Sequence, residues 1–241
     1  MASDVRSDAG SAAGSDAGSA IQGGDGRRTL GAILYPGFEL LDLYGPLEMF
    51  GTLADRYRIV TIAGTKGAVA SSQGPCTVAE HDFADAPACE LLLLPGGMGT
   101  IPALSDAGLL GYLTRASATA AVTMSVCSGS AILARAGLLD GLRATSNKQF
   151  FTLARAQSAK VEWTEAARWV DAGRFVTSSG VSAGIDMALA VIARLDGAAV
   201  AEQVADITEY QWHRDADVDP FARFLDAAMG GIPPVAYLPP G

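Results

Sequence analysis

The heptapeptide Met124-Ser125-Val126-Cys127-Ser128-Gly129-Ser130 is the stretch of this sequence that says most about the fold. An apolar, β-branched run precedes it and a segment of helical character follows it. Small residues two positions before and after a nucleophile permit a sharp strand-to-helix turn, a nucleophile elbow, and here they are Ser125 and Gly129. The turn would place the Cys127 thiol at a helix N-terminus, where the dipole and free N–H groups favour the thiolate. The alternative interpretation is a buried cysteine that acts only as a small hydrophobe.

Apolar runs on both sides of this stretch predict the strands of a sheet. They lie at 29–34, 57–63, 90–94 and 121–126, with a weaker segment at 78–83 and a hairpin at 169–177. The run Glu90-Leu91-Leu92-Leu93-Leu94 is typical of a central parallel strand that is buried on both faces. Since helical segments separate the strands, we expect an α/β fold: a mostly parallel sheet with helices on both faces, as in a flavodoxin-like three-layer sandwich.

Helical patterns fill the connections between these strands. They cover 40–50, 109–118, 130–139, 147–156 and 198–210, and Ser182 is the predicted N-cap of a further apolar helix. In a sheet of this kind, functional sites form at the carboxyl ends of the strands. Cys127 and the turn Pro95-Gly96-Gly97 both follow strands, so we expect the site there.

Composition excludes several classes of function. A formal net charge of −9 and a pI near 4.6, without a local cluster of Lys or Arg, argue against a nucleic-acid partner. No run approaches the roughly 18 apolar residues of a membrane span, which argues against a membrane partner. The three cysteines lack paired spacing and indicate reduced thiols in a cytoplasmic protein. No residues have metal-ligand spacing, and the glycine-rich stretch 96–99 lacks nucleotide-binding patterns, so we expect no metal and no cofactor.

The two ends of the chain differ in composition from the middle. Residues 1–28 repeat Ser-Asp-Ala-Gly-Ser-Ala at 7–12 and 15–20 and contain no aromatic residue, which predicts a disordered tail. We expect a single domain over 29–228 and an irregular C-terminal tail over 229–241.

Several motifs, in the same order along the chain, resemble the ThiJ/PfpI superfamily, which has the fold of class I glutamine amidotransferases. They are Leu94-Pro95-Gly96-Gly97, the Cys127 elbow, and Ala136-Gly137-Leu138-Leu139-Asp140-Gly141 followed by Arg143-Ala144-Thr145. Two more, Leu41-Asp42-Leu43-Tyr44-Gly45-Pro46 and Gly180-Val181-Ser182-Ala183-Gly184-Ile185-Asp186, are similar to the branch that holds isonitrile hydratases and the amidase-like domains of some AraC-type regulators. The resemblance covers roughly 29–212 and implies a homodimer, and we see no helix-turn-helix pattern after residue 212.

The resemblance also implies roles for individual residues. Cys127 matches the family nucleophile, and Asp42 matches the acidic residue that hydrogen-bonds the cysteine sulfur in isonitrile hydratases. The backbone N–H groups of Gly97 and Ser128 match the pair that would stabilise an anion beside the sulfur. Asn147 follows a stretch after which many relatives carry a histidine, and we assign it with Gly97 and Ser128 to substrate binding.

Two features of the chain leave alternatives open. Its only histidines, His81 and His213, lie in no matching motif, so we do not expect a Cys–His–acid triad. Asp42 stands in an otherwise apolar stretch, where it is either a partly buried acid with a raised pKa or merely a helix N-cap or exposed residue.

The leading hypothesis is a cofactor-free cysteine enzyme that adds water to a small carbon–nitrogen electrophile, turning an isonitrile into an N-substituted formamide. Cys127 would attack carbon and Asp42 would transfer protons. One alternative is a glyoxalase or deglycase that acts on α-oxoaldehydes. Another is a non-catalytic redox sensor in which Cys127 oxidises to the sulfinate. The expected partners are a small-molecule substrate and a second copy of the chain.

Overall fold

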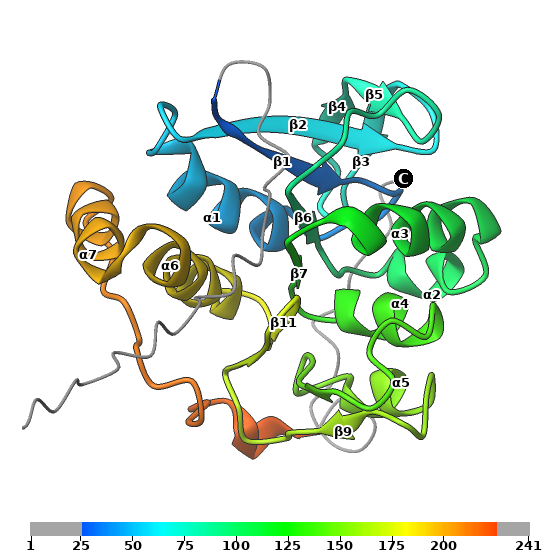
Figure 1. The fold of residues 1–241 in the computed structure, drawn as a ribbon. Coiled ribbons are helices and arrows are strands. Elements are labelled where there is room, and N and C mark those ends of the chain that lie inside the picture. The colour runs from blue at the N-terminus through cyan, green and yellow to red at the C-terminus, as the bar shows by residue number, and fades with distance from the viewer. Residues whose placement is uncertain (1–25, 226–241) are drawn as a thin grey trace, which may run out of the picture.

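The computed structural model describes residues 26–225, which fold around one central sheet (Figure 1). Its seven strands are β1 (Arg28–Ile33), β2 (Tyr57–Ala63), β5 (His81–Asp82), β6 (Leu91–Leu94), β7 (Val122–Ser125), β10 (Trp169–Ala172) and β11 (Phe175–Ser178). They lie in the order β10-β11-β7-β6-β1-β2-β5, and only the β10–β11 hairpin is antiparallel. The central order β2-β1-β6-β7-β11 is that of a flavodoxin-like sheet. The predicted α/β class and mostly parallel sheet are confirmed.

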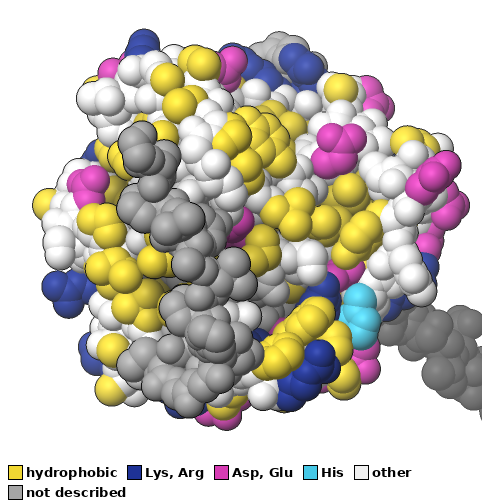
Figure 2. Space-filling view, turned by 180° about the vertical axis from the view of Figure 1, so that it is seen from behind, with side chains coloured by type: hydrophobic (Ala, Val, Ile, Leu, Met, Phe, Trp, Pro, Cys, Tyr) yellow, Lys and Arg dark blue, Asp and Glu magenta, His cyan; other side chains and the backbone are white. Residues whose placement is uncertain are grey.

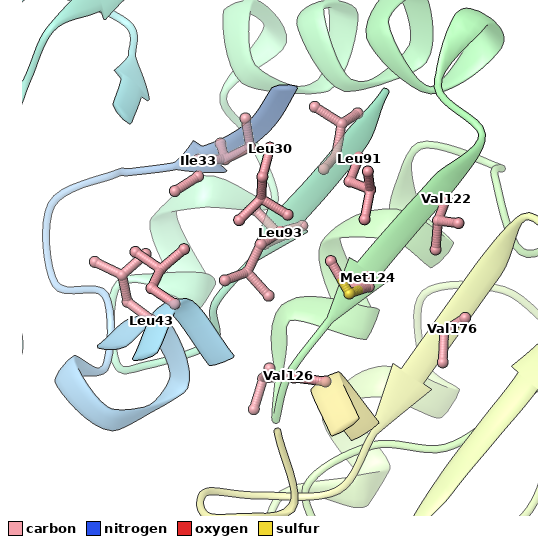
Figure 3. Close-up of a cluster of buried hydrophobic side chains, with 14 of the residues drawn as sticks. Leu30, Ile33, Leu43, Leu91, Leu93, Val122, Met124, Val126 and Val176 are labelled. Atoms are coloured by element: carbon pink, nitrogen blue, oxygen red, sulfur yellow. The ribbon is translucent and has the colours of Figure 1, made fainter. Parts of the chain in front are cut away.

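The middle of the sheet is the apolar run of leucines. All four residues of β6 are buried, and β6 pairs with β1 on one side and β7 on the other. A strand without polar side chains must be covered on both faces, and the helices supply that cover. Side chains from β1, β6, β7, β11 and the first helix form the cluster in Figure 3, which includes Leu30, Leu93, Met124 and Val176.

Helices cover both faces of the sheet (Figure 1). On one face lie α1 (Leu40–Gly51), α6 (Ala183–Asp196) and α7 (Ala198–Ile207). On the other lie α2 (Thr100–Ala103), α3 (Ala107–Thr119), α4 (Gly129–Arg135) and α5 (Phe151–Arg155). Within residues 26–225, none of the helices has the length and apolar character that crossing a membrane requires.

Smaller elements flank this core. Strands β3 (Gly67–Ala70) and β4 (Cys76–Ala79) form an antiparallel hairpin, and β8 (Arg143–Ala144) pairs in parallel with β9 (Glu162–Trp163). The weak segment expected at 78–83 is divided between β4 and β5. A single 3₁₀ turn, η1 (Ala222–Phe224), ends the part of the chain that the structure describes.

One helix begins later than expected, and the predicted N-cap residue of another makes no capping bond. The helix predicted over 147–156 begins only at Phe151, because Asn147 Oδ1 accepts the backbone N–H groups of Gln149 at 2.9 Å and Phe150 at 3.2 Å and so forms a turn instead. Ser182 stands at the N-cap position of α6 but makes no capping bond, and its Oγ accepts from Arg168 Nη2 at 3.4 Å. The predicted N-cap position is confirmed, although the Ser182 side chain makes no capping hydrogen bond. The predicted tails lie outside the described residues, apart from residues 26–28.

Candidate active site

Cys127 lies in the turn between β7 and α4. Its φ of 59° is left-handed, a conformation that costs a non-glycine residue about 1–3 kcal/mol unless the surroundings enforce it. Here the Cys127 N–H donates to the carbonyls of Ser178 and Ser179, each at 3.2 Å. Gly129 packs so closely on the end of β6 that an added Cβ would lie 2.6 Å from the Leu94 carbonyl oxygen. The structure thus has the elbow that the heptapeptide predicts.

Asp42 lies in the first turn of α1 and is fully buried. Its Oδ2 accepts the backbone N–H of Gly96 at 2.8 Å, from the loop that follows β6. Its Oδ1 has no well-oriented hydrogen-bond partner among the described residues, and the carboxyl group interacts with the thiol of Cys127. Glu39, not Asp42, occupies the N-cap position of α1. The structure therefore brings Asp42 and Cys127 together as a buried acid–thiol pair.

Burial dominates the electrostatics of this pair. It raises the pKa of Asp42 well above its usual value; the Gly96 N–H and the Cys127 thiol counteract this, and the charge of Glu39 adds to it. Burial also raises the pKa of Cys127, and the carboxylate of Asp42 raises it further, whereas the Ser128 N–H and Asn147 lower it. The Ser128 N–H at the start of α4 favours the thiolate, as expected for a helix terminus, but burial of the thiol outweighs it.

Asn147 reaches the sulfur directly. Its Nδ2 donates to Cys127 Sγ at 3.0 Å. The orientation of the amide is fixed, because Oδ1 already accepts two backbone N–H groups in the turn that delays α5. Gly180 makes room for the contact: a Cβ there would clash with the Asn147 amide and lie 3.1 Å from Sγ. Sequence reasoning missed this role of Gly180, since a glycine inside a longer motif gives no sign of what it packs against.

Gly97 and Ser128 contact each other, but only the N–H of Ser128 faces the sulfur. The Ser128 N–H interacts with Cys127, whereas the Gly97 N–H donates to Ser128 Oγ at 3.1 Å. That hydroxyl is linked to Thr100 Oγ1 at 2.9 Å, and Thr100 Oγ1 to Tyr35 OH at 3.1 Å. Of the predicted pair of anion-binding N–H groups, the structure therefore places only that of Ser128 at the sulfur, and the Gly97 N–H holds the Ser128 side chain instead.

Both histidines are engaged elsewhere. His81 Nδ1 lies 3.6 Å from Asp85 Oδ1, and His213 Nε2 lies 3.0 Å from the Val218 carbonyl. In the part of the chain that the structure describes, no three His, Cys, Asp or Glu side chains are grouped to hold a metal ion. The titratable partner of Cys127 in this site is therefore the carboxyl group of Asp42.

Comparisons with known proteins agree with this architecture. The DJ-1/PfpI family model matches residues 30–194. Isonitrile hydratase from Pseudomonas putida is 33% identical over 181 residues, which cover 75% of this chain and 78% of that protein. The HTH-type transcriptional regulator CdhR from Pseudomonas aeruginosa is 28% identical over 72% of this chain, but the match spans only 52% of the regulator. The crystal structure of a ThiJ/PfpI family protein from Pseudomonas syringae superposes with a TM-score of 0.70 at 32% identity, covering 89% of this chain and 98% of that one.

Proposed function

The chain belongs to the DJ-1/PfpI family, and on that premise we propose that it is a cysteine-dependent hydratase that converts an isonitrile and water into an N-substituted formamide. The observation that carries the proposal is the buried Asp42 carboxyl beside the Cys127 thiol, with no histidine in the site. Water addition to an isonitrile requires a nucleophile and one group that both gives and takes a proton. The similarity to the Pseudomonas putida isonitrile hydratase supports the same reaction.

The first half of the reaction joins the sulfur to the substrate. The pair holds one proton, which moves from the Cys127 thiol to the Asp42 carboxylate as the sulfur attacks the terminal carbon of the isonitrile and an S–C bond forms. The protonated Asp42 carboxyl gives its proton to that carbon, which yields a thioimidate and leaves Asp42 as the carboxylate. Burial raises the pKa of Asp42, so its carboxylate is a stronger base toward the thiol proton and toward water than an exposed aspartate would be.

The second half releases the product. Asp42 takes a proton from a water molecule as its oxygen adds to the thioimidate carbon, and the substrate nitrogen receives that proton. The S–C bond then breaks, the thiolate leaves and the hydroxyl proton returns to Asp42, so that the formamide departs and the pair is restored. Asn147 Nδ2 and the Ser128 N–H stabilise the thiolate at its formation and at its departure.

The test is turnover of benzyl isonitrile by the wild type and three site variants, with the formamide measured by mass spectrometry. Cys127→Ala should abolish turnover. Asp42→Asn keeps an acceptor for the Gly96 N–H but cannot donate a proton to carbon, so kcat should fall by about 10²–10⁴-fold, and Asp42→Glu should retain part of it.

Glu48→Gln is the matched control, because Glu48 is an exposed carboxylate on the same helix and should leave kcat unchanged. Near-wild-type kcat in Asp42→Asn would refute the role given to Asp42. Turnover of methylglyoxal in place of the isonitrile would assign the same Cys–Asp pair to α-oxoaldehyde chemistry and overturn the proposal.

A further inference from the structure

A cavity of about 360 Å³ lies beside residues that contact the sulfur. Its lining includes Asn147 and Gly180, the two residues that pack against Cys127 Sγ. Cys127 itself is 6% exposed and does not line the cavity, so Asn147 and Gly180 lie between the cavity and the sulfur. A volume of this size accommodates a ligand of several heavy atoms. The cavity is therefore placed to hold the part of a substrate that lies farther from the reacting carbon.

The wall of the cavity is mostly apolar. Its apolar lining consists of Leu41 of α1, Val181 just before α6, and Phe221 and Phe224 of the C-terminal segment. Lys148 also contributes, but its ammonium group is turned into the protein, where it donates to Thr145 Oγ1 at 2.9 Å and to the Ala167 carbonyl at 2.6 Å. No carboxylate residue lines the cavity among residues 26–225. A charged substituent would find no unpaired counter-ion here.

Asp219 fixes the two phenylalanines in position. It is buried, with Oδ2 3.7 Å from Lys148 Nζ and Oδ1 3.6 Å from Arg168 Nη1. Its Oδ1 also accepts the backbone N–H of Phe221 at 3.0 Å, and the rings of Phe221 and Phe224 lie stacked with centroids 6.4 Å apart. Hydrophobic and basic side chains lie together at the lower right of Figure 2, where this segment runs. The family match ends at residue 194, so Phe221 and Phe224 lie outside the matched part of the chain.

We propose that the cavity binds the uncharged, apolar substituent of the substrate, of about the size of a phenyl or benzyl group, and that Phe221 and Phe224 determine this preference. The inference rests on the proposed function for the identity of the reacting group, but the preference for an apolar substituent is a property of the cavity alone. It can therefore be measured without turnover.

The experiment compares two alkylating reagents on the Cys127 thiol in a Cys76→Ser background, because Cys76 is an exposed thiol that would react as well. Iodoacetamide is the small reagent, N-benzyl iodoacetamide is the apolar one, and mass spectrometry of the Cys127 peptide gives both rate constants. Relative to glutathione, the protein should favour the benzyl reagent by about tenfold. Phe221→Ala and Phe224→Ala should each remove most of that preference and leave the iodoacetamide rate within about twofold, which also shows that the fold is intact.

Val218→Ala is the matched control, because Val218 is an exposed apolar residue of the same segment that does not line the cavity. It should leave the preference unchanged. A wild-type preference equal to that of glutathione, or one that survives both phenylalanine variants, would overturn the inference. A benzyl preference without isonitrile turnover would refute the proposed reaction but not the assignment of the cavity. Isonitrile turnover without a benzyl preference would refute the assignment of the cavity but not the reaction.

Discussion

Two acidic groups share one buried volume at the centre of the site, the thiol of Cys127 and the carboxyl of Asp42. Each ionises with difficulty, since burial penalises the charged form. Whichever group loses its proton first leaves a negative charge that opposes ionisation of the other. The Ser128 N–H and Asn147 Nδ2 act in the opposite direction at the sulfur. Such a pair tends to hold one proton between two atoms, which a reaction that protonates carbon and later deprotonates water requires.

The pH dependence of alkylation should report this coupling. In the wild type, the rate at which iodoacetamide modifies Cys127 should rise with a midpoint above the ordinary cysteine pKa of about 8.5, because burial and Asp42 both raise the thiol pKa. Asp42→Asn removes the negative charge, so its midpoint should shift to lower pH and alkylation near neutral pH should become faster. Asn147→Leu removes a donor to the sulfur and should shift the midpoint upward. A midpoint in Asp42→Asn equal to or above that of the wild type would contradict this assignment.

The sequence predicts the positions of the site residues better than it predicts their contacts and their pKa shifts. The position of Cys127 follows from small neighbours within a few residues, so a local pattern is sufficient. The direction of its pKa shift depends on Asp42, which belongs to another element, and no local pattern gives it. The contact of Asn147 with the sulfur likewise depends on Gly180, a residue from a third segment. Electrostatic properties of a site were thus the least predictable from the chain, because they depend on burial and on distant partners.

The packing of α1 on α6 depends on a glycine in the interior of α1. A Cβ at Gly45 would lie 2.7 Å from Ile185 Cγ1, so the two helices could not remain at their present separation. Gly45→Ala should lower the free energy of unfolding by about 1–3 kcal/mol through this overlap, despite the better helix propensity of alanine. Because Asp42 lies on the same helix, the variant should also reduce turnover.

Gly111→Ala in α3 is the matched control for this prediction. The nearest atom to an added Cβ there is Arg115 Nη1 at 3.4 Å, the end of a flexible side chain. Alanine should then raise the free energy of unfolding by up to about 1 kcal/mol through helix propensity alone. Urea unfolding followed by circular dichroism measures both values, and a Gly45→Ala variant as stable as Gly111→Ala would show that the helix contact tolerates a methyl group.

Elements were predictable wherever one pattern dominated. The leucine run of β6 had to be a central strand, and the hairpin at Trp169–Ala172 and Phe175–Ser178 was confirmed. The start of α5 was not, because the Asn147 side chain competes with the helix for the same backbone N–H groups. The hydroxyl of Ser182 likewise binds Arg168 instead of capping α6. For Ser182 a tertiary contact replaced the local cap, whereas for Asn147 a local turn replaced the first turn of the helix.

The topology of the whole molecule assembles the site. Strands β1, β6 and β7 are adjacent and parallel, so their carboxyl ends meet at one edge of the sheet. The segments that follow them carry Asp42, Gly96 and Cys127 respectively. Residues far apart in the sequence therefore converge because of strand order. This is also why the family resemblance predicted the pairing of Asp42 with Cys127 although the spacing of the two residues could not.

The sequence resemblance also implies a homodimer, and the surface of the structure offers a candidate interface for it. Tyr44 on α1 and Val78 on β4 are 47% and 63% exposed, and Tyr44 OH lies 2.7 Å from Thr77 Oγ1, which places α1 beside this hairpin. Exposed apolar side chains that lie close together are typical of interfaces. We expect a homodimer of twice the 24.7 kDa chain mass by light scattering at micromolar concentration.

Val78→Glu should shift that dimer toward monomer, because burying an unpaired carboxylate at an apolar interface is costly and Val78 makes no side-chain hydrogen bond that the change would remove. Ile207→Glu is the matched control, since Ile207 on α7 is 62% exposed and belongs to a different part of the surface. It should leave the dimer intact. Light scattering with both variants, and alkylation of Cys127 as a check that each is folded, tests the assignment. A monomeric wild type would rule out the dimer, and a dimer that persists in Val78→Glu but not in Ile207→Glu would move the interface to α7.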